Sequence, residues 1–336
     1  MKDIVIYVKT TNECQLKCEH CYNTVSPFKG TMIDNVVQQT IQFIKEKAKD
    51  NNCLVIFHGG EPMMGGIDKI QTIIKSLETI ENIKFTITTN LMYKITDDHI
   101  KLFEKMATMS GKNLVSTSWD YKIRFANNEQ EQLWENNVKL LLKHNINVAP
   151  IVSVTSLLIN ETTPYEIISK FNDMGITRMN FERLTETGRA SDNKSLKALN
   201  KDVDEWLYQA YITAKELDVV VSLFDGLKQA IFDNNFVGCR KRECQKNVIT
   251  INPDGTIAGC PNCSNNIYGN IDGRYNEKLF NKFALKEEIK SNDCYLCDLY
   301  EYCNGDCFQL QWDKTGCPAL KKIIKAMIEE KNNGNI

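Results

Sequence analysis

The sequence predicts an α/β protein in which a parallel sheet is followed by a small cysteine-rich region. Two observations predict the sheet: short runs rich in β-branched residues recur roughly every 30 residues, and an amphipathic helical pattern follows each run. A third observation separates the C-terminal part of the chain. After residue 238, Asn, Gly and Asp become dense, and nine of the thirteen cysteines occur there.

Each predicted strand is four to six residues long, and a predicted helix follows it. This alternation of strands and helices is typical of parallel βα units. Six such units can form either an open doubly wound sheet or an incomplete barrel, and periodicity does not separate the two. The strands are expected at residues 4–8, 54–57, 84–88, 114–118, 147–152 and 178–181.

The predicted helices begin near residues that commonly cap helices, namely Asp34, Thr96 and either Thr162 or Thr163. In the fourth helix, Leu133, Trp134, Val138, Leu140 and Leu141 recur with helical spacing. The helices are expected at residues 34–49, 67–80, 97–108, 129–144, 164–174 and 202–217.

We expect three parts: a sheet domain at residues 1–217, a bridging segment at 218–238 and a cysteine-rich domain at 239–336. Within the last part, residues 249–257 resemble a hairpin whose turn is Asn-Pro-Asp-Gly, and a final helix is expected at about 318–330. This part has little apolar material of its own, so metal would have to organise it.

The composition limits the classes of protein to which the chain can belong. It has 336 residues, a formal net charge of −2, 42% hydrophobic and 25% charged residues, which is typical of a folded protein. A near-neutral charge argues against nucleic acid or an anionic membrane as a partner. No apolar run reaches the ~18–20 residues of a membrane span, and the N-terminus does not resemble a signal peptide. We therefore expect a cytoplasmic protein.

Thirteen cysteines are unexpected in a reducing compartment, because disulfides rarely persist there and the number is odd. The other uses of cysteine are metal ligation, redox chemistry and filling of the core. Three cysteines lie between residues 14 and 21, one is Cys53, and nine follow residue 238. Such clustering indicates metal ligation.

The first cluster, Cys14, Cys18 and Cys21, follows the first predicted strand. Three thiolates on one loop can hold an iron–sulfur cluster and leave one iron with an open coordination position. An open position on a metal is typical of sites that bind a substrate or a cofactor. The alternative is a zinc site with His20 as the fourth ligand, which is awkward because His20 and Cys21 are adjacent.

The spacing Cys-x3-Cys-x2-Cys-Tyr after the first strand resembles the cluster-binding loop of the radical S-adenosylmethionine (SAM) superfamily. In that family, three cysteines hold a 4Fe–4S cluster whose fourth iron binds SAM. Reduction of the cluster cleaves SAM to a 5′-deoxyadenosyl radical, which abstracts a substrate hydrogen. The resemblance implies that Cys14, Cys18 and Cys21 are the ligands and that the fold is a partial (β/α)6 barrel, which the six predicted units match.

Further segments that resemble the family follow the next strands, where barrel enzymes place their chemistry. Gly-Gly-Glu-Pro after the second strand is similar to the segment that binds the amino group of SAM, although paired glycines also suit a tight turn. Ser118 would contact SAM and Asp120 would position the loop, whereas each residue alone is equally typical of a turn. Arg183 would hold cofactor or substrate, or form a surface ion pair. The implied cofactor-binding residues are Tyr22, Gly59, Gly60, Glu61, Pro62, Asn90, Ser118, Asp120 and Arg183.

The distal cysteines resemble the SPASM extension of many radical SAM enzymes, which carries two auxiliary 4Fe–4S clusters. Cys53 is expected in the core, whereas Cys263 has metal-ligand spacing with Cys260 and could replace Cys239 or Cys244. Two zinc sites are the alternative for the whole region. The resemblance implies that Cys239, Cys244, Cys260 and Cys307 hold the nearer cluster, and that Cys294, Cys297, Cys303 and Cys317 hold the outer one.

SPASM-bearing enzymes mostly modify peptides and proteins, and auxiliary clusters suit net oxidations because they can accept an electron. We therefore expect oxidative modification of a peptide or protein side chain, with a low-potential donor such as flavodoxin or ferredoxin. The alternatives are a dehydrogenase of small molecules, a sulfatase-maturase-like enzyme and a non-catalytic electron-transfer protein.

The sulfatase maturases carry a proposed catalytic Asp where this chain has Pro261. Asp254 or Asp306 could substitute as the base, and nothing in the sequence selects either. Only 13 residues precede Cys14 and 19 follow Cys317. We therefore expect recognition of any leader peptide to need a separate protein or the surface of the cysteine-rich domain.

Overall fold

The computed structural model describes residues 1–110 and 114–334. Within this part of the chain, ten strands form one sheet in the order β10-β9-β8-β1-β2-β3-β4-β5-β6-β7, in which β1 to β7 are parallel to their neighbours. The six predicted strands are all present. The parallel strands are β1 (Lys2–Thr11), β2 (Asn51–Gly59), β3 (Ile83–Thr89), β4 (Leu114–Ser118), β5 (Asn147–Val154), β6 (Arg178–Arg183) and β7 (Val220–Val221).

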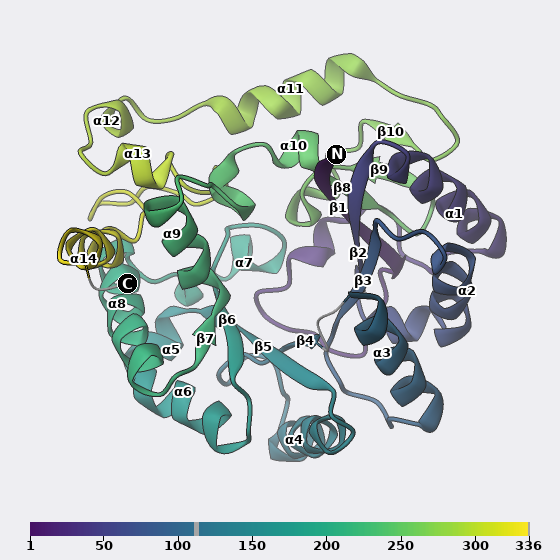
Figure 1. The fold of residues 1–336 in the computed structure, drawn as a ribbon, viewed down its shortest axis with the longest axis horizontal. Coiled ribbons are helices and arrows are strands. Elements are labelled where there is room, and N and C mark those ends of the chain that lie inside the picture. Colours follow the sequence, from purple (N-terminus) through teal and green to yellow (C-terminus); the bar gives the residue numbers. More distant parts are fainter. Residues whose placement is uncertain (111–113, 335–336) are drawn as a thin grey trace.

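Helices cover the outside of the curved sheet, as Figure 1 shows. The sheet ends at β7 and at β10, which are not paired with each other, so the strands form a partial barrel. The partial barrel predicted from the family resemblance is therefore confirmed. The covering helices are α1 (Asp34–Ala48), α2 (Ile67–Leu77), α3 (Asp97–Ser110), α4 (Asn128–Lys143), α6 (Pro164–Asp173) and α8 (Asn200–Glu216).

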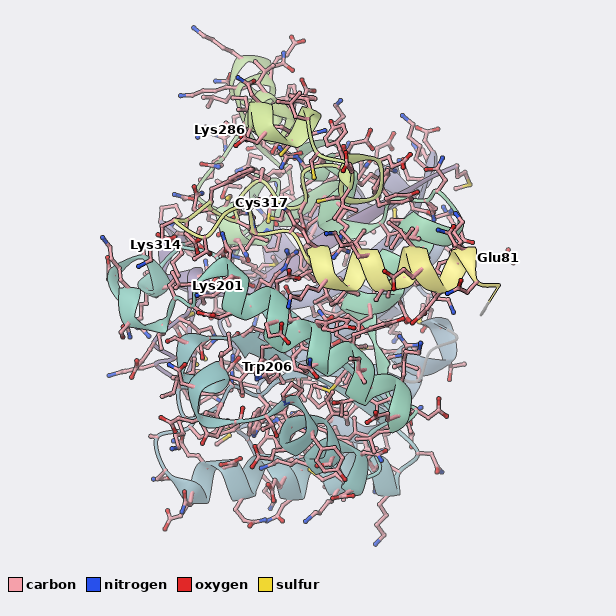
Figure 2. The ribbon with its side chains drawn as sticks, turned by 90° about the vertical axis from the view of Figure 1, so that its left-hand side faces the viewer. Glu81, Lys201, Trp206, Lys286, Lys314 and Cys317 are labelled. Carbon is pink, nitrogen blue, oxygen red and sulfur yellow. The ribbon has the colours of Figure 1, made fainter. Side chains whose placement is uncertain are left out.

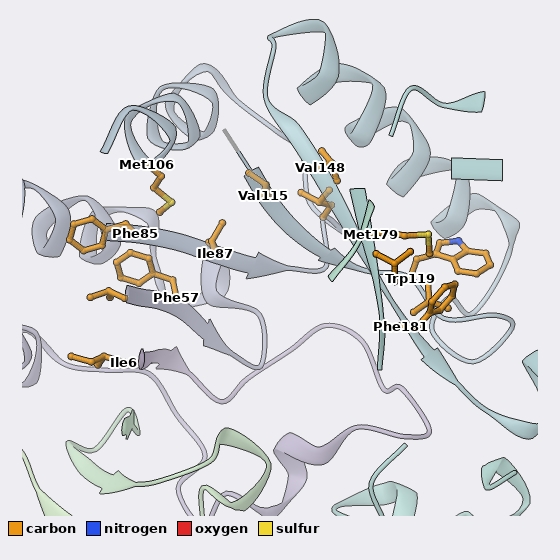
Figure 3. Close-up of a cluster of buried hydrophobic side chains, with 14 of the residues drawn as sticks. Ile6, Phe57, Phe85, Ile87, Met106, Val115, Trp119, Val148, Met179 and Phe181 are labelled. Carbon is orange, nitrogen blue, oxygen red and sulfur yellow. The ribbon is translucent and has the colours of Figure 1, made fainter. Parts of the chain in front are cut away.

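Alternation along the strands separates an apolar outer face from a polar inner face. Ile6, Phe57 and Phe85 are fully buried on the outer face, where they pack beneath the helices (Figure 3). Tyr7 and His58 occupy the alternate positions of the same strands and are only partly buried. The hydrophobic effect therefore closes the outside of the barrel, and polar side chains line its inside.

Two of the predicted helix starts can be compared with the structure. Thr163 caps α6 through a capping box with Glu166, as the sequence predicts. Helix α1 begins at residue 34 as predicted, but the prediction that Asp34 caps it is wrong, because Ile33 is the capping residue and Asp34 lies in the first turn. An acidic residue inside the first turn still stabilises a helix through its dipole.

The segment at residues 218–238, which the sequence predicts only as a bridge, contains β7 and the helix α9 (Ser222–Phe232). Phe224 and Leu227 of α9 are buried in the hydrophobic core. The helix packs against β6, so this segment extends the covering layer. The three-part division at residues 217 and 238 stays a prediction.

The C-terminal region joins the sheet on the side of β1. The predicted hairpin is confirmed: β8 (Val248–Ile251) pairs with β1 in parallel, and β9 (Thr256–Ala258) pairs with β8 in antiparallel orientation. The predicted last helix is α14 (Lys321–Asn332), which packs on α8 and α9 and is seen along α8 in Figure 2. The remaining strand is β10 (Gly269–Asn270).

The remaining helices are α11 (Glu277–Glu288) of the C-terminal region and a set of short elements. In this described part, no helix combines the length and apolar composition that crossing a membrane requires. The short elements are η1 (Tyr22–Val25), η2 (Pro62–Gly65), α5 (Ser156–Glu161), α7 (Arg189–Asp192), η3 (Lys194–Leu196), η4 (Gly238–Lys241), α10 (Cys244–Asn247), η5 (Pro261–Cys263), α12 (Asn292–Tyr295) and α13 (Tyr300–Cys303).

Candidate functional site

The loop that carries Cys14, Cys18 and Cys21 follows β1 at the carboxyl edge of the parallel sheet. In the described residues, none of the three cysteines forms a disulfide. Burial, with smaller contributions from the charges of Glu61, Cys18 and Cys21, raises the pKa of Cys14 to about 11, against the effect of a hydrogen bond from the Leu16 amide. The Cys21 amide donates to the Cys18 carbonyl at 3.3 Å, so a turn of the loop joins these two residues, and the charge of each raises the pKa of Cys14.

Asp120 anchors this loop to the ends of β4 and β5. The buried carboxylate lies 3.3 Å from Nε2 of His20 and 2.6 Å from Nε of Arg124, and it accepts a hydrogen bond from the Ser153 amide at 2.8 Å. Burial alone would raise the pKa of Asp120, but Arg124 and His20 hold it well below its usual range. His20 thus contacts a carboxylate through one ring nitrogen, and this contact ties the cysteine loop to Asp120.

Gly188 and Arg189 hold the other end of the loop. Arg189 donates from its backbone amide to the Cys21 carbonyl at 3.1 Å and from Nη1 to the Cys18 carbonyl at 3.2 Å. Gly188 has φ +59°, and a Cβ there would lie 2.4 Å from the Cys21 carbonyl oxygen. A side chain at residue 188 would therefore displace the cysteine loop, which explains the glycine.

The glycines after β2 pack against the same loop. A Cβ on Gly59 would lie 2.1 Å from the Thr11 carbonyl oxygen, and a Cβ on Gly60 would lie 2.0 Å from the Glu13 carbonyl oxygen. The Gly60 amide donates to Thr11 at 2.9 Å. The close backbone approach expected of this pair is thus made to the chain itself, and it fixes the start of the cysteine loop.

Glu61 and Pro62 connect three strand ends. The fully buried Glu61 carboxylate accepts hydrogen bonds from the Asn90 amide at 2.7 Å and from the Thr89 hydroxyl at 2.8 Å. Burial raises the pKa of Glu61 to about 7, against the effect of these hydrogen bonds. The Pro62 carbonyl accepts a hydrogen bond from Thr10. Because its oxygens are occupied by protein groups, Glu61 positions strand ends in this structure.

Asn90 and Ser118 lie at the ends of β3 and β4. The Asn90 side chain donates to Cys14 Sγ at 3.5 Å and to Gln15 at 3.3 Å, so it contacts the cysteine loop directly. Ser118 is half-buried on the inner face of β4. The structure therefore brings the strand-end residues expected from the sequence to one edge of the sheet.

Four inner-face residues outside the expected cofactor-binding set lie beside Tyr22. The Tyr22 hydroxyl is 3.1 Å from the His58 ring nitrogens, and Lys9 Nζ lies 5.9 Å from the centre of the Tyr22 ring. Burial, and after it the Lys9 charge, lowers the pKa of His58 to about 3. The Tyr7 ring packs edge-on against the His58 ring. The charge of Glu182 raises the pKa of both Tyr7 and Tyr22. The only sequence signal for these residues was polarity at alternate positions of β1, β2 and β6.

The nearer group of distal cysteines faces this inner side. Hydrogen bonding with Cys244 raises the pKa of Cys239, while a hydrogen bond from Cys307 lowers it, and Cys260 also acts on it. Burial raises the pKa of Cys260 to about 12, with Cys263 the next largest cause. The four cysteines expected to share a cluster are thus brought together, and Cys263 lies in the same group.

The outer group is only partly brought together. Burial raises the pKa of Cys294, and Cys317 and Cys297 raise it further. Burial also raises the pKa of Cys303 to about 12, but the charges that act most strongly on Cys303 are those of Asp306 and Arg240. Cys53 is buried in the core, as the sequence predicts.

Arg183 and Asp306 join the two regions of the chain. Arg183 donates to both carboxylate oxygens of Asp306, at 2.7 and 2.8 Å, and to the Pro318 carbonyl at 3.0 Å. Burial would raise the pKa of Asp306, but Arg183 and Arg240 hold it well below its usual range. A carboxylate so stabilised is a poor proton acceptor. Asp254 accepts from the amide and hydroxyl of Thr256 within the β8–β9 turn, which also indicates a structural contact.

In the part of the chain that the structure describes, no group of three or more His, Cys, Asp or Glu side chains converges as the ligands of a single metal ion do. The cysteines of an iron–sulfur cluster bind different irons and surround the cluster without meeting at one point. The grouping of the cysteines around two loops, most of them only partly buried, therefore fits the donor set of such clusters.

Comparisons with known proteins agree with this geometry. Residues 8–174 match the model of the radical SAM superfamily. The chain is 22% identical over 369 residues to the radical SAM cyclopropyl synthase TigE of Paramaledivibacter caminithermalis, which covers 98% of this chain and 74% of that protein. It is 23% identical over 335 residues to a cysteine-type anaerobic sulfatase-maturating enzyme of Clostridium novyi, which covers 91% of this chain and 88% of that enzyme.

A solved structure has the same fold along nearly the whole chain. It is native anSMEcpe with bound AdoMet and the Cp18Cys peptide, with a TM-score of 0.78 and 19% sequence identity, and the match covers 98% of this chain and 99% of that one. At this identity, the likeness shows the fold.

Proposed function

Because this chain belongs to the radical SAM superfamily, we propose that it is an enzyme that oxidatively modifies a side chain of a peptide or protein. The observation that carries this proposal is the position of the cysteine loop. Cys14, Cys18 and Cys21 lie at the carboxyl edge of a parallel barrel, and the loop adjoins a polar inner face whose other side carries a second cysteine group.

Cys14, Cys18 and Cys21 would hold the SAM-binding 4Fe–4S cluster, and Gly59, Gly60 and Ser118 belong to the segments that would face SAM. Bound there, SAM supplies on reductive cleavage a carbon radical that removes a hydrogen atom from the substrate. Asn90 and Asp120 support the loop from the neighbouring strands. Tyr22 and His58 present polar groups to the inner space, where they exclude or orient water around the substrate.

The distal cysteines would hold two auxiliary 4Fe–4S clusters. The proposed ligands of the nearer cluster are Cys239, Cys244, Cys260 and Cys307. Cys263 is a proposed alternative ligand, because its charge raises the pKa of Cys260. The outer cluster would use Cys294, Cys297, Cys303 and Cys317. Clusters with tuned potentials can take up the second electron that an oxidation releases.

A peptide or protein substrate is supported by the relatives. The protein from Clostridium novyi acts in maturing sulfatases, and anSMEcpe binds a peptide. Pro261 opens η5 at the place where the sulfatase maturases resembled by this chain carry their proposed base. Asp306 is occupied by Arg183. We therefore propose a modification other than sulfatase maturation. A low-potential flavodoxin or ferredoxin is the proposed electron donor.

Anaerobic reconstitution with iron and sulfide, followed by dithionite and SAM, tests the enzyme class. We expect about twelve irons per chain, for three cubane clusters, and formation of 5′-deoxyadenosine. A non-catalytic electron-transfer protein would hold iron and yield no 5′-deoxyadenosine, and that outcome would refute the proposal. Incubation with peptides encoded next to the gene then tests the substrate class by a loss of hydrogen mass.

A further inference from the structure

Lys9 is a lysine in the interior whose ammonium has no carboxylate partner. It is 0% exposed. Its Nζ donates to Asn23 Oδ1 and to Ser264 Oγ, both at 2.8 Å. Both acceptors are neutral and buried. Within the described residues, no ion pair of Lys9 with a carboxylate is found, so these hydrogen bonds leave its charge without a counter-ion.

A buried ammonium without a counter-ion is costly, because removing an ion from water is unfavourable by several kcal/mol. Half-buried Lys170 shows the usual solution: it pairs with Glu131 at 2.8 Å and Glu135 at 3.0 Å. Lys9 also has two cysteines as neighbours. Burial lowers the pKa of Lys9 to about 7, and negative charge on Cys21 and Cys260 acts in the opposite direction. These sulfurs would carry that charge as ligands of iron.

Those two cysteines belong to different cysteine groups. Cys21 closes the loop after β1, and Cys260 precedes η5 in the C-terminal region. The elements η1 and η5 pack against each other. Asn23 lies in η1 and Ser264 directly follows η5, so Lys9 lies beneath the contact between the two loops and holds one side chain from each.

We infer that Lys9 is a positioning residue whose ammonium is the shared counter-ion of the SAM-binding cluster and the nearer auxiliary cluster. This inference rests on the proposed function, because it needs clusters at Cys21 and Cys260. A nearby positive charge favours the reduced, more negative state of a cluster, since net charge and hydrogen bonds set cluster potentials. Lys9 therefore makes both clusters easier to reduce, and its hydrogen bonds fix the separation of their loops.

The test compares Lys9→Gln, which removes the charge, with Lys9→Arg, which keeps it. Lys170→Gln is the matched control, because Lys170 lies between α4 and α6 with its own carboxylate partners. Each protein is reconstituted, its iron is counted, and its clusters are titrated by EPR-monitored reduction. In Lys9→Gln we expect the potentials of the SAM-binding and nearer auxiliary clusters to shift to more negative values. In Lys9→Arg and Lys170→Gln we expect them near those of the wild type.

Unchanged potentials in Lys9→Gln at full iron content would overturn the inference. If Lys9→Gln fails to take up iron but Lys9→Arg takes it up, the positive charge at residue 9 is needed. If both variants fail, the inference is overturned, and Lys9 is needed for packing alone. Ser264→Ala removes one hydrogen bond of Lys9 and keeps its charge. In this variant we expect a smaller shift of the reduction potential, confined to the nearer auxiliary cluster. Wild-type protein without clusters refutes the proposed function as well, whereas active wild type with unchanged variant potentials refutes only this inference.

Discussion

The interior of the parallel barrel differs from that of the cysteine-rich region in what fills it. Between β1 and β6, aliphatic and aromatic side chains such as Ile6, Phe57 and Phe85 are fully buried beneath the helices. Between residues 239 and 317, few apolar side chains are buried, and several large ones, including Leu285, Ile289 and Leu296, are exposed. The barrel therefore has an apolar core of its own, which the other region lacks.

Polar contacts replace apolar burial in the cysteine-rich region. Arg242 donates to the carbonyls of Ile289 and Asp306, and Glu287 accepts hydrogen bonds from the Gln245 amide. Such contacts stabilise a fold weakly on balance, by about 1 kcal/mol each. Metal–thiolate bonds can supply the missing stability. We therefore expect the cysteine-rich region to need iron in order to fold, and the barrel to need iron for its chemistry alone.

The largest expected effect follows removal of iron. Chelation should abolish amide hydrogen-exchange protection in residues 239–317, while β2 to β5 keep theirs, because apolar burial holds those strands. Exchange measured by mass spectrometry on reconstituted and chelated protein checks this. Equal loss of protection in both regions would refute the claim that only the cysteine-rich region depends on iron for its stability.

Next in size is the ion pair that joins the two regions. Arg183→Met leaves the buried Asp306 without its bidentate partner and should lower the free energy of unfolding by about 3–5 kcal/mol. Arg178→Met, at the start of the same strand, is the control, because its pair with Asp225 is partly exposed and should contribute less than about 1 kcal/mol. Denaturant unfolding measures both. Similar losses in the two variants would refute a special role for Arg183.

A smaller effect is expected at the cysteine loop. Asp120→Asn removes the charge that faces Arg124 and His20, and should lower stability by roughly 1.5–3 kcal/mol. We also expect slower iron uptake by the first cluster, measured as its EPR signal after reconstitution. Glu161→Gln, which breaks an exposed pair with Lys122, is the control and should leave that signal unchanged. Wild-type uptake in Asp120→Asn would show that the loop needs no anchor.

The last expected effect is a pH slope, which is small per pH unit and accumulates across the range. The pKa of Glu61 is raised to about 7 in the folded chain from an ordinary 4.5, so the folded state binds the proton more tightly than the unfolded state. Stability should therefore fall as pH rises from 4.5 to 7, by no more than about 1.4 kcal/mol per pH unit. Urea unfolding of iron-free protein measures the slope. We expect Glu61→Gln to flatten it, and an unchanged slope would contradict the assignment.

Local pattern predicted the strands well, because apolar residues alternate along β1 to β6 and each strand is followed by an amphipathic helix. The motifs of the cysteine loop and of Asp120 are short and could be found by local pattern, and the roles assigned to these residues stay predictions. The sequence did not predict that Lys9 contacts Ser264 or that Arg183 pairs with Asp306, because these partners lie 255 and 123 residues apart. Periodicity carries no information on such contacts. Helix α9 was missed because the segment around it showed no strand-helix alternation.

The central claim is that the barrel holds the reactive cluster and the cysteine-rich region holds the auxiliary ones. The most direct test substitutes Cys14, Cys18 and Cys21 by Ala together and compares iron content and 5′-deoxyadenosine with the wild type. We expect iron to fall from about twelve to about eight per chain and SAM cleavage to stop, while the auxiliary-cluster absorbance remains. Cleavage of SAM that survives in this variant would contradict the account.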